Sequence, residues 1–187
     1  MSSKSSGVGL LGYRKFRETA LEDVYQAARE VANDGNNQFY RRAFVRALFA
    51  FIEADVWGRK SVALYFRDKA HLTDLEVAAA SEHTPDLDEK GRVIGKSPRL
   101  QLKPNVLFSF QVFARAFEVR DFHLATNDHG WQAFRTAIAI RNRLMHPKSR
   151  DDLSISDDDL QTCCDALNWY EAESARVATL AAESLES

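Results

Sequence analysis

The chain has 187 residues, which is the size of one domain or of one domain with an insertion. Hydrophobic residues make up 45% and charged residues 28% of it, and 8 Gly, 4 Pro and 2 Cys exclude collagen, low-complexity chains and disulfide scaffolds. With a formal net charge of −2, the surface as a whole does not attract nucleic acid, so any site for a polyanion must be local.

Apolar residues recur at helical spacing along almost the whole chain. The segments with this spacing cover about residues 18–32, 38–69, 73–81, 106–117, 129–146 and 157–184. Gly58 is a candidate kink in the second segment. Residues 1–12 open on a Ser- and Gly-rich run and are expected to be a disordered tail, ahead of a single helical domain over residues 13–187. We therefore predict an all-α fold with a four-helix-bundle core and extra short helices.

The helical pattern breaks over about residues 83–103. This stretch holds two of the four prolines and two glycines, and its short apolar runs flank the turn residues 88–91, Asp-Glu-Lys-Gly. Short apolar runs on either side of a turn are typical of a hairpin. We expect a loop or a small β-hairpin inserted into the helical protein.

Membrane, metal and cofactor sites are not expected. The longest stretch without a charged residue, 104–114, is shorter than the roughly 20 residues of a membrane helix, and we expect no signal peptide in residues 1–13. Residues 7–12 match the dinucleotide fingerprint G-x-G-x-x-G but lack the strand that must precede it. The histidines and cysteines form no cluster with metal-ligand spacing, so we predict neither a metal nor another cofactor.

The two cysteines, Cys163 and Cys164, are adjacent in the sequence. They cannot form a disulfide with each other without severe strain, which favours a reducing, cytoplasmic compartment. Cys164 falls on the apolar stripe of the last helix, so we expect it to pack in the core rather than to bind a metal or act in redox chemistry.

The segment from Trp131 to Leu160 carries the most informative residues. On a helical projection, Arg141 falls on the stripe of Phe134 and Ile138, whereas Arg135 and Arg143 point away from it. A buried arginine requires a partner or a polar cleft, because an unpaired buried charge is costly. Glu53 of the second helix is one candidate partner.

Pro147 marks the end of this helix. The residue before a proline is disfavoured in the α conformation, so the helix should end near His146, with Asn142 one turn earlier. The C-terminus of a helix favours a protonated imidazole, and histidine suits proton transfer near neutral pH.

Charge is distributed unevenly around this point. No acidic residue lies between His129 and Arg150, and five aspartates follow over residues 151–159. Ser156 and Asp159 have the spacing of a capping box, and the aspartates favour the N-terminus of the last helix. The basic residues are therefore expected to face another anion, and phosphate is the natural candidate. The five of them are Arg135, Arg141, Arg143, Lys148 and Arg150.

The sequence Arg141-Asn142-Arg143-Leu144-Met145-His146 resembles the R-(four to six residues)-H motif of the HEPN superfamily of helical domains, in which the Arg is often followed by Asn. The resemblance covers about residues 134–160. It implies a metal-independent endoribonuclease that forms a homodimer, so that two motifs face one cleft. It also implies a role as a toxin or a phage-defence effector, with RNA as substrate and an antitoxin or defence-system protein as a further partner.

The resemblance also implies roles for single residues. Arg141 would bind the scissile phosphate and stabilise its transition state, His146 would be the general acid or base, and Asn142 would orient one of them. The residues that would attract the phosphate backbone are Arg143, Lys148, Arg150 and Arg135. Some toxin members carry a tyrosine two residues after the His, which a partner antitoxin nucleotidylates. Here that position is Lys148, so control of this kind is not expected.

Two alternatives stay open. The first is a non-catalytic HEPN-like module that binds RNA, a nucleotide or a protein. The second is a purely structural helical dimer in which an acid such as Glu53 neutralises Arg141. Catalysis requires Arg141 and His146 to be open to a shared groove, whereas the structural hypothesis requires Arg141 to be sealed in a salt bridge.

Overall fold

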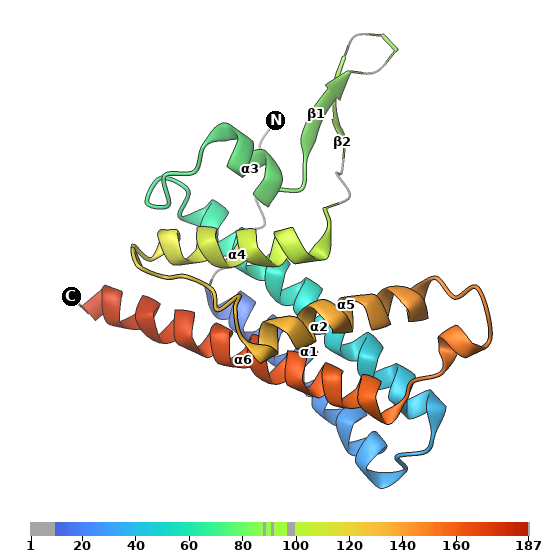
Figure 1. Cartoon of the computed structure of the whole chain (residues 1–187). Helices are drawn as coiled ribbons and strands as arrows, with labels where there is room; N and C mark the ends of the chain where they lie inside the picture. The colour runs from blue at the N-terminus through green and yellow to red at the C-terminus, as the bar shows by residue number, and fades with distance from the viewer. Residues whose placement is uncertain (1–9, 88, 91, 97–99, 187) are drawn as a thin grey trace.

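The computed structural model describes residues 10–87, 89–90, 92–96 and 100–186 (Figure 1). The described elements are α1 (Leu10–Asn33), α2 (Gln38–Tyr65), α3 (Asp74–Ala80), β1 (Thr84–Leu87), β2 (Val93–Lys96), α4 (Leu102–Ala116), α5 (His129–Met145), the 3-10 helix η1 (Asp151–Leu153) and α6 (Asp157–Glu186). The predicted all-α fold is confirmed, and the helices form a bundle.

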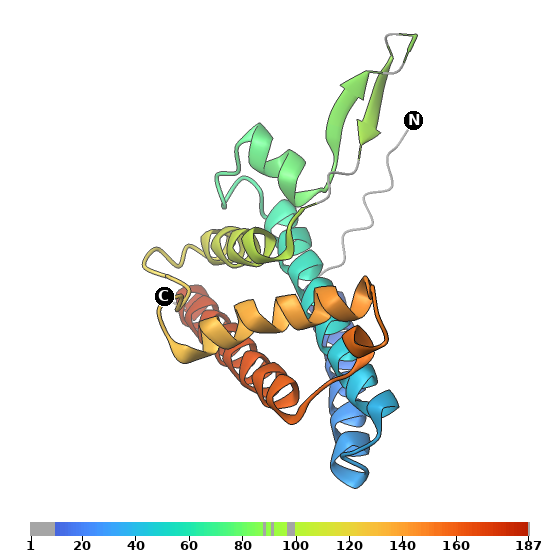
Figure 2. The same ribbon diagram turned by 45° about the vertical axis from the view of Figure 1, so that its right-hand side comes forward.

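The helix α2 lies at the centre of the bundle (Figures 1 and 2). It packs along α1, from which a tight turn separates it, while α5 and α6 form a second pair that lies against α2. The helix α4 packs against the C-terminal half of α2. Aromatic rings join these elements in the core, because Tyr170 of α6 contacts Phe51 of α2, Phe110 of α4 and Phe134 of α5 with ring centroids 5.8, 5.8 and 6.4 Å away.

The start of the chain differs from the prediction. The first helix begins at Leu10, so residues 10–12 belong to α1 and not to a disordered tail; the tail predicted for residues 1–9 lies outside the described residues. Tertiary contacts explain the earlier start, because the hydroxyl of Tyr13 donates a hydrogen bond of 2.5 Å to Asp55 of α2, and its ring packs against Phe113 of α4.

Gly58 does not divide α2, which is continuous to Tyr65 and shorter than predicted. The glycine instead permits a close approach, since a Cβ built at Gly58 would lie 2.3 Å from the ring of Tyr13. A similar contact joins α5 to α6, where a Cβ at Gly130 would lie 2.6 Å from the Cβ of Trp169. Both glycines are therefore places where two helices pack closely.

The predicted insertion is a β-hairpin. The strands β1 and β2 are antiparallel, with Thr84 opposite Lys96 and Leu87 opposite Val93, and the hairpin projects from the bundle (Figures 1 and 2). A buried lysine anchors its base: the ammonium of Lys60 donates hydrogen bonds to Glu82, just before β1, and to Asn105 of α4. No helix in the described part of the chain is long and apolar enough to cross a membrane.

The buried face of α6 includes Cys163, whereas the sequence predicted that it would include Cys164. Both are free, but Cys163 is buried and Cys164 is exposed, so the expectation that Cys164 packs in the core is wrong. The buried face of α6 follows Cys163, Ala166, Leu167 and Tyr170, and this stripe leaves Cys164 on its flank.

Candidate functional site

The C-terminus of α5 ends as the sequence predicts. Met145 is its last helical residue, and His146 caps it with φ −130° and ψ 57°, donating its backbone N–H to the carbonyl of Asn142 over 3.0 Å. Pro147 then turns the chain away. The imidazole of His146 is exposed at the surface, at the start of the loop that leads to α6.

An open pocket of about 540 Å³ lies at this end of the helix. Its lining residues come from the last turn of α5 and from the loop that follows: Asn142, Arg143, His146, Lys148 and Asp152. The structure thus brings four of the seven predicted site residues to one surface. The side chains of Asn142, Arg143 and Lys148 are suited to bind an anion beside the solvent-exposed imidazole of His146.

Asp152 is a pocket residue that the sequence analysis did not select. Its carboxylate accepts hydrogen bonds from the backbone N–H groups of Lys148 and Ser149, over 2.7 and 2.9 Å, and the bond from Lys148 makes the largest contribution to lowering its pKa. Asp152 therefore fixes the loop after Pro147. It also reduces the positive charge that the sequence led us to expect there.

Arg141 does not line this pocket, because its side chain turns towards α2. Its Nη2 donates a hydrogen bond of 2.6 Å to Oε1 of Glu53, and its Nη1 donates one of 3.1 Å to the side chain of Asn142. The side chains of Arg141 and Glu53 keep 27% and 48% of their surface exposed. Arg141 is therefore paired but still partly exposed to solvent. The catalytic hypothesis requires it to be open to a groove and the structural hypothesis requires it to be buried in a salt bridge, so its position is intermediate.

Arg143 lies differently from the prediction. The sequence placed it on the outward face, but it is half-buried and donates a hydrogen bond of 2.8 Å to Oδ2 of Asp159 at the start of α6. The reason is tertiary, because the loop after α5 folds back and brings the N-terminus of α6 beside Arg143 (Figure 1). The Nε of Arg143 is buried, with no hydrogen-bond partner in the part of the chain that the structure describes.

The predicted capping box at the start of α6 is present. Asp159 accepts the backbone N–H of Ser156 over 3.0 Å and donates its own N–H to the hydroxyl of Ser156 over 3.1 Å. Burial alone would raise the pKa of Asp159, but the bonds from Ser156 and Arg143 hold it below its ordinary value. Asp159 thus serves both the helix terminus and Arg143, so the expectation that the aspartates leave all basic residues unpaired is wrong for Arg143.

The other two basic residues lie outside the pocket. Arg135 is exposed in the second turn of α5 and donates a hydrogen bond of 3.1 Å to Gln132. Arg150 is exposed in the loop, where it precedes η1. Neither lines the pocket with His146, so only a ligand that extends beyond the pocket would reach them.

Arg41 is a supporting residue that the sequence analysis missed. It is buried at the start of α2 and donates hydrogen bonds to the carbonyls of Gly35 and Ile155 and to the carboxylate of Asp157, over 2.5, 2.8 and 2.6 Å. These bonds hold the end of the α5–α6 loop against α2. The sequence does hold a sign of this role: Arg41 lies three residues before Phe44, so a helical projection places it on the apolar face of α2, where a charge requires a partner.

In the described residues, no group of three or more His, Cys, Asp or Glu side chains is placed to hold a metal ion. No family model, curated protein or solved structure matches this chain. The resemblance of residues 134–160 to HEPN domains therefore stays a prediction from the motif.

Proposed function

We propose that this chain is a metal-independent endoribonuclease of the HEPN type. The observation that carries the proposal is that Asn142, Arg143, His146 and Lys148 line one open pocket. An exposed imidazole between cationic and amide side chains is suited to proton transfer at a phosphodiester. In this proposal RNA binds across the pocket, and the cations at its edge attract the backbone.

The ion pair of Arg141 with Glu53 is compatible with this role. Exposed and half-exposed ion pairs contribute only about 0–1 kcal/mol, because water screens them and hydrates each partner when they separate. Glu53 is 48% exposed, so it can be hydrated once Arg141 turns to a phosphate. The pair therefore does not commit the guanidinium of Arg141 to the fold.

The reaction that fits these residues is an intramolecular transfer. The ribose 2′-hydroxyl attacks the adjacent phosphorus, so that an O2′–P bond forms and the P–O5′ bond breaks. One group removes the proton from the 2′-hydroxyl, and another supplies a proton to the leaving 5′-oxygen; His146 performs one of these transfers. The products are a 2′,3′-cyclic phosphate and a 5′-hydroxyl, and DNA, which has no 2′-hydroxyl, is not cleaved.

We further propose a homodimer that brings two copies of the motif to one cleft. One chain supplies a single His146 and a single Arg141, and a two-fold contact duplicates both. Met145, beside His146, is 47% exposed and offers an apolar contact for a second copy. Action as a cytoplasmic toxin or phage-defence effector, under the control of an antitoxin or defence-system partner, belongs to the same proposal and has its support in the resemblance alone.

Cleavage of RNA in the presence of EDTA tests the proposal. The wild type is compared with His146→Ala and with the matched control His129→Ala, which removes an exposed histidine from the other end of α5. His146→Ala should reduce the rate by roughly 100-fold or more, the usual scale for a general acid or base, and the control should cleave normally. The products should carry a 2′,3′-cyclic phosphate.

A non-catalytic RNA-binding module is the second candidate, because catalysis requires Arg141 and His146 in one groove, whereas Arg141 does not line the pocket of His146. If His146→Ala cleaves as fast as the wild type, the enzymatic proposal is wrong. Binding of RNA in a gel shift by both the wild type and His146→Ala, with cleavage by neither, would support the binding module.

A further inference from the structure

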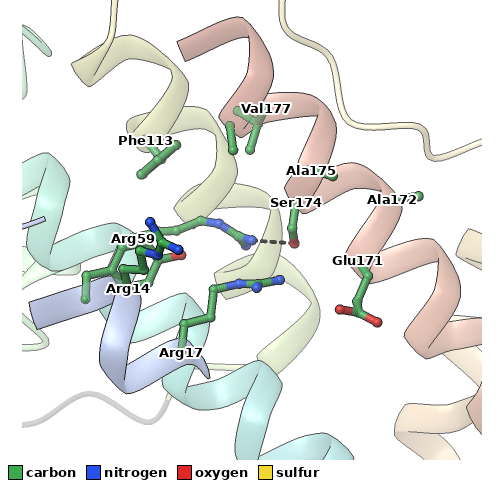
Figure 3. Close-up of a pocket in the computed structure, with 11 residues that line it drawn as sticks. Arg14, Arg17, Arg59, Phe113, Glu171, Ala172, Ser174, Ala175 and Val177 are labelled. Carbon is green, nitrogen blue, oxygen red and sulfur yellow. Dashed lines mark hydrogen bonds between the residues drawn. The ribbon is translucent and has the colours of Figure 1, made fainter. Parts of the chain in front are cut away.

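A second pocket, of about 520 Å³, opens between α1 and α6 and shares no residue with the pocket that His146 lines (Figure 3). Its walls combine polar, aromatic and small side chains from four helices, among them Tyr13, Arg17, Arg59, Phe113, Ala172 and Ala175. This volume falls within the range of about 300–1,000 Å³ that is usual for small-molecule sites. The alanines of α6 are too small to fill the space that separates them from α1.

The floor of this pocket is a buried guanidinium. Arg59 is 1% exposed, and its Nη1 and Nη2 donate hydrogen bonds to Tyr170 over 3.0 Å and to Ser174 over 2.6 Å; Figure 3 marks the second of these. Its Nη2 also lies 2.6 Å from Oδ2 of Asp55, without the alignment of a hydrogen bond. The guanidinium stacks on the ring of Phe110 at 3.7 Å, so it is fixed in position.

The charges on this floor do not cancel. Asp55 is fully buried and is shared between two arginines, because Nε of Arg17 also lies 3.2 Å from its Oδ1. Tyr13 and Tyr170 add no negative charge, since burial raises the pKa of each phenol well above its ordinary value. On the floor itself, the guanidinium groups of Arg17 and Arg59 and the carboxylate of Asp55 leave one positive charge in excess; the other carboxylate of the lining, Glu171, lies at the rim.

Arg17 offers the unused hydrogen-bond donors. Its Nε lies 3.2 Å from Asp55 and its guanidinium lies over the ring of Phe51 at 5.3 Å, but in the described part of the chain neither Nη1 nor Nη2 donates a hydrogen bond. The side chain is 25% exposed, and in Figure 3 it extends across the pocket towards Glu171 and Ser174 of α6. The carboxylate of Glu171 is itself engaged at the rim, where it accepts a hydrogen bond of 2.8 Å from Tyr25.

We propose that this pocket binds a small organic anion, a ligand that carries one phosphate or carboxylate group on an apolar body. The anionic group accepts two hydrogen bonds from the planar guanidinium of Arg17, whose geometry fits a phosphate as well as a carboxylate. Its negative charge neutralises the excess positive charge of the floor. The apolar body lies against the alanines of α6 and the ring of Phe113. Since the two pockets share no residue, this proposal does not depend on ribonuclease activity.

Isothermal titration calorimetry of the full chain tests the proposal, with phenyl phosphate and benzoate as the two organic probes and inorganic phosphate as the probe without an apolar body. At least one organic probe should bind with a dissociation constant below about 1 mM. Inorganic phosphate should bind roughly tenfold more weakly or worse, because it makes no apolar contact.

Two variants locate the bound probe. Arg17→Gln should weaken binding by roughly tenfold, the effect of one charge-assisted contact. Ala175→Trp fills the pocket from an exposed position on α6 that does not touch the buried charges, and it should abolish binding. Arg29→Gln, which changes an exposed arginine of α1 outside the pocket, should bind as the wild type does.

Circular dichroism establishes whether each variant is folded. If Arg17→Gln does not fold, the affinity of Ala175→Trp alone tests whether the probe binds in this pocket. The proposal is overturned if neither organic probe binds at about 10 mM, or if the folded Ala175→Trp variant binds as tightly as the wild type. Equal affinity for inorganic phosphate and for the organic probes would overturn the assignment of an apolar body.

Discussion

Replacement of Arg59 by methionine tests how much the buried ion pair of Arg59 with Asp55 contributes to the stability of the bundle. Methionine is long and apolar, so it can occupy much of the space between Phe110 and Tyr170 that the guanidinium now fills. The substitution nevertheless leaves Asp55, which no solvent reaches, with only the hydrogen bond from Tyr13 and the contact to Arg17. The loss of stability therefore arises more from the buried carboxylate of Asp55, which has lost an ionic partner, than from the reduced side-chain volume.

The magnitude follows from these contacts. Breaking a buried ion pair by removing one partner costs about 3–5 kcal/mol, because the other charge stays buried. The remaining partners of Asp55 place Arg59→Met near the lower end, at about 3 kcal/mol, which is a large part of the 5–15 kcal/mol that is typical for a domain. The double variant Arg59→Met/Asp55→Leu removes both charges and should recover about 1–2 kcal/mol of this loss.

Urea denaturation at pH 7, followed by circular dichroism, measures these free energies of unfolding when the slope m is the same for all variants. Arg14→Met, which breaks an exposed ion pair with Glu18 on α1, is the matched control and should leave the midpoint unchanged. A loss below about 1 kcal/mol for Arg59→Met, or a double variant less stable than the single one, would refute the reasoning.

Two further predictions concern packing and acid stability. Gly130→Ala forces a Cβ to within 2.6 Å of Trp169, so it should destabilise the fold by about 1–3 kcal/mol, and an unchanged thermal midpoint would contradict the close helix contact. The hydrogen bonds from Arg115 lower the pKa of Glu76 from 4.5 to about 2, so this carboxylate stabilises the fold above pH 4.5 and loses that contribution as the pH falls towards 2. After allowance for solvent screening the contribution is about 1 kcal/mol, and urea midpoints measured from pH 5 to pH 2 should fall less steeply for Glu76→Gln than for the wild type.

The parts of the structure that the sequence predicts are those with local causes. The proline at position 147 ends α5 at His146, and Ser156 caps α6 through its spacing to Asp159, whatever the rest of the chain does. Hairpin residues likewise specify a turn from their own chemistry, and the insertion formed where the helical pattern broke. Periodicity also located most helices, because each buries one face.

The parts that were missed depend on residues far apart in the chain. Arg143 points outward on a helical projection, and only the returning loop places Asp159 beside it. In the same way, Leu10 is helical because the turn that follows it finds partners on α2 and α4. Glu53 could be named as a candidate partner of Arg141, but that the pair would stay half-exposed required the packed structure.

The polar residues of α2 have a consequence for the rotational register of this helix. Apolar side chains surround most of α2, so hydrophobic burial alone distinguishes poorly between one rotation about its axis and another. Glu53 bonds to α5 and Lys60 to α4 from one face of α2, where they lie seven residues apart, whereas Arg59 bonds to α6 from a face about 100° away. An inserted residue would turn the helix by about 100° and break all three together. Charge, rather than hydrophobicity, thus distinguishes the side of α2 that faces α4 and α5 from the side that faces α6.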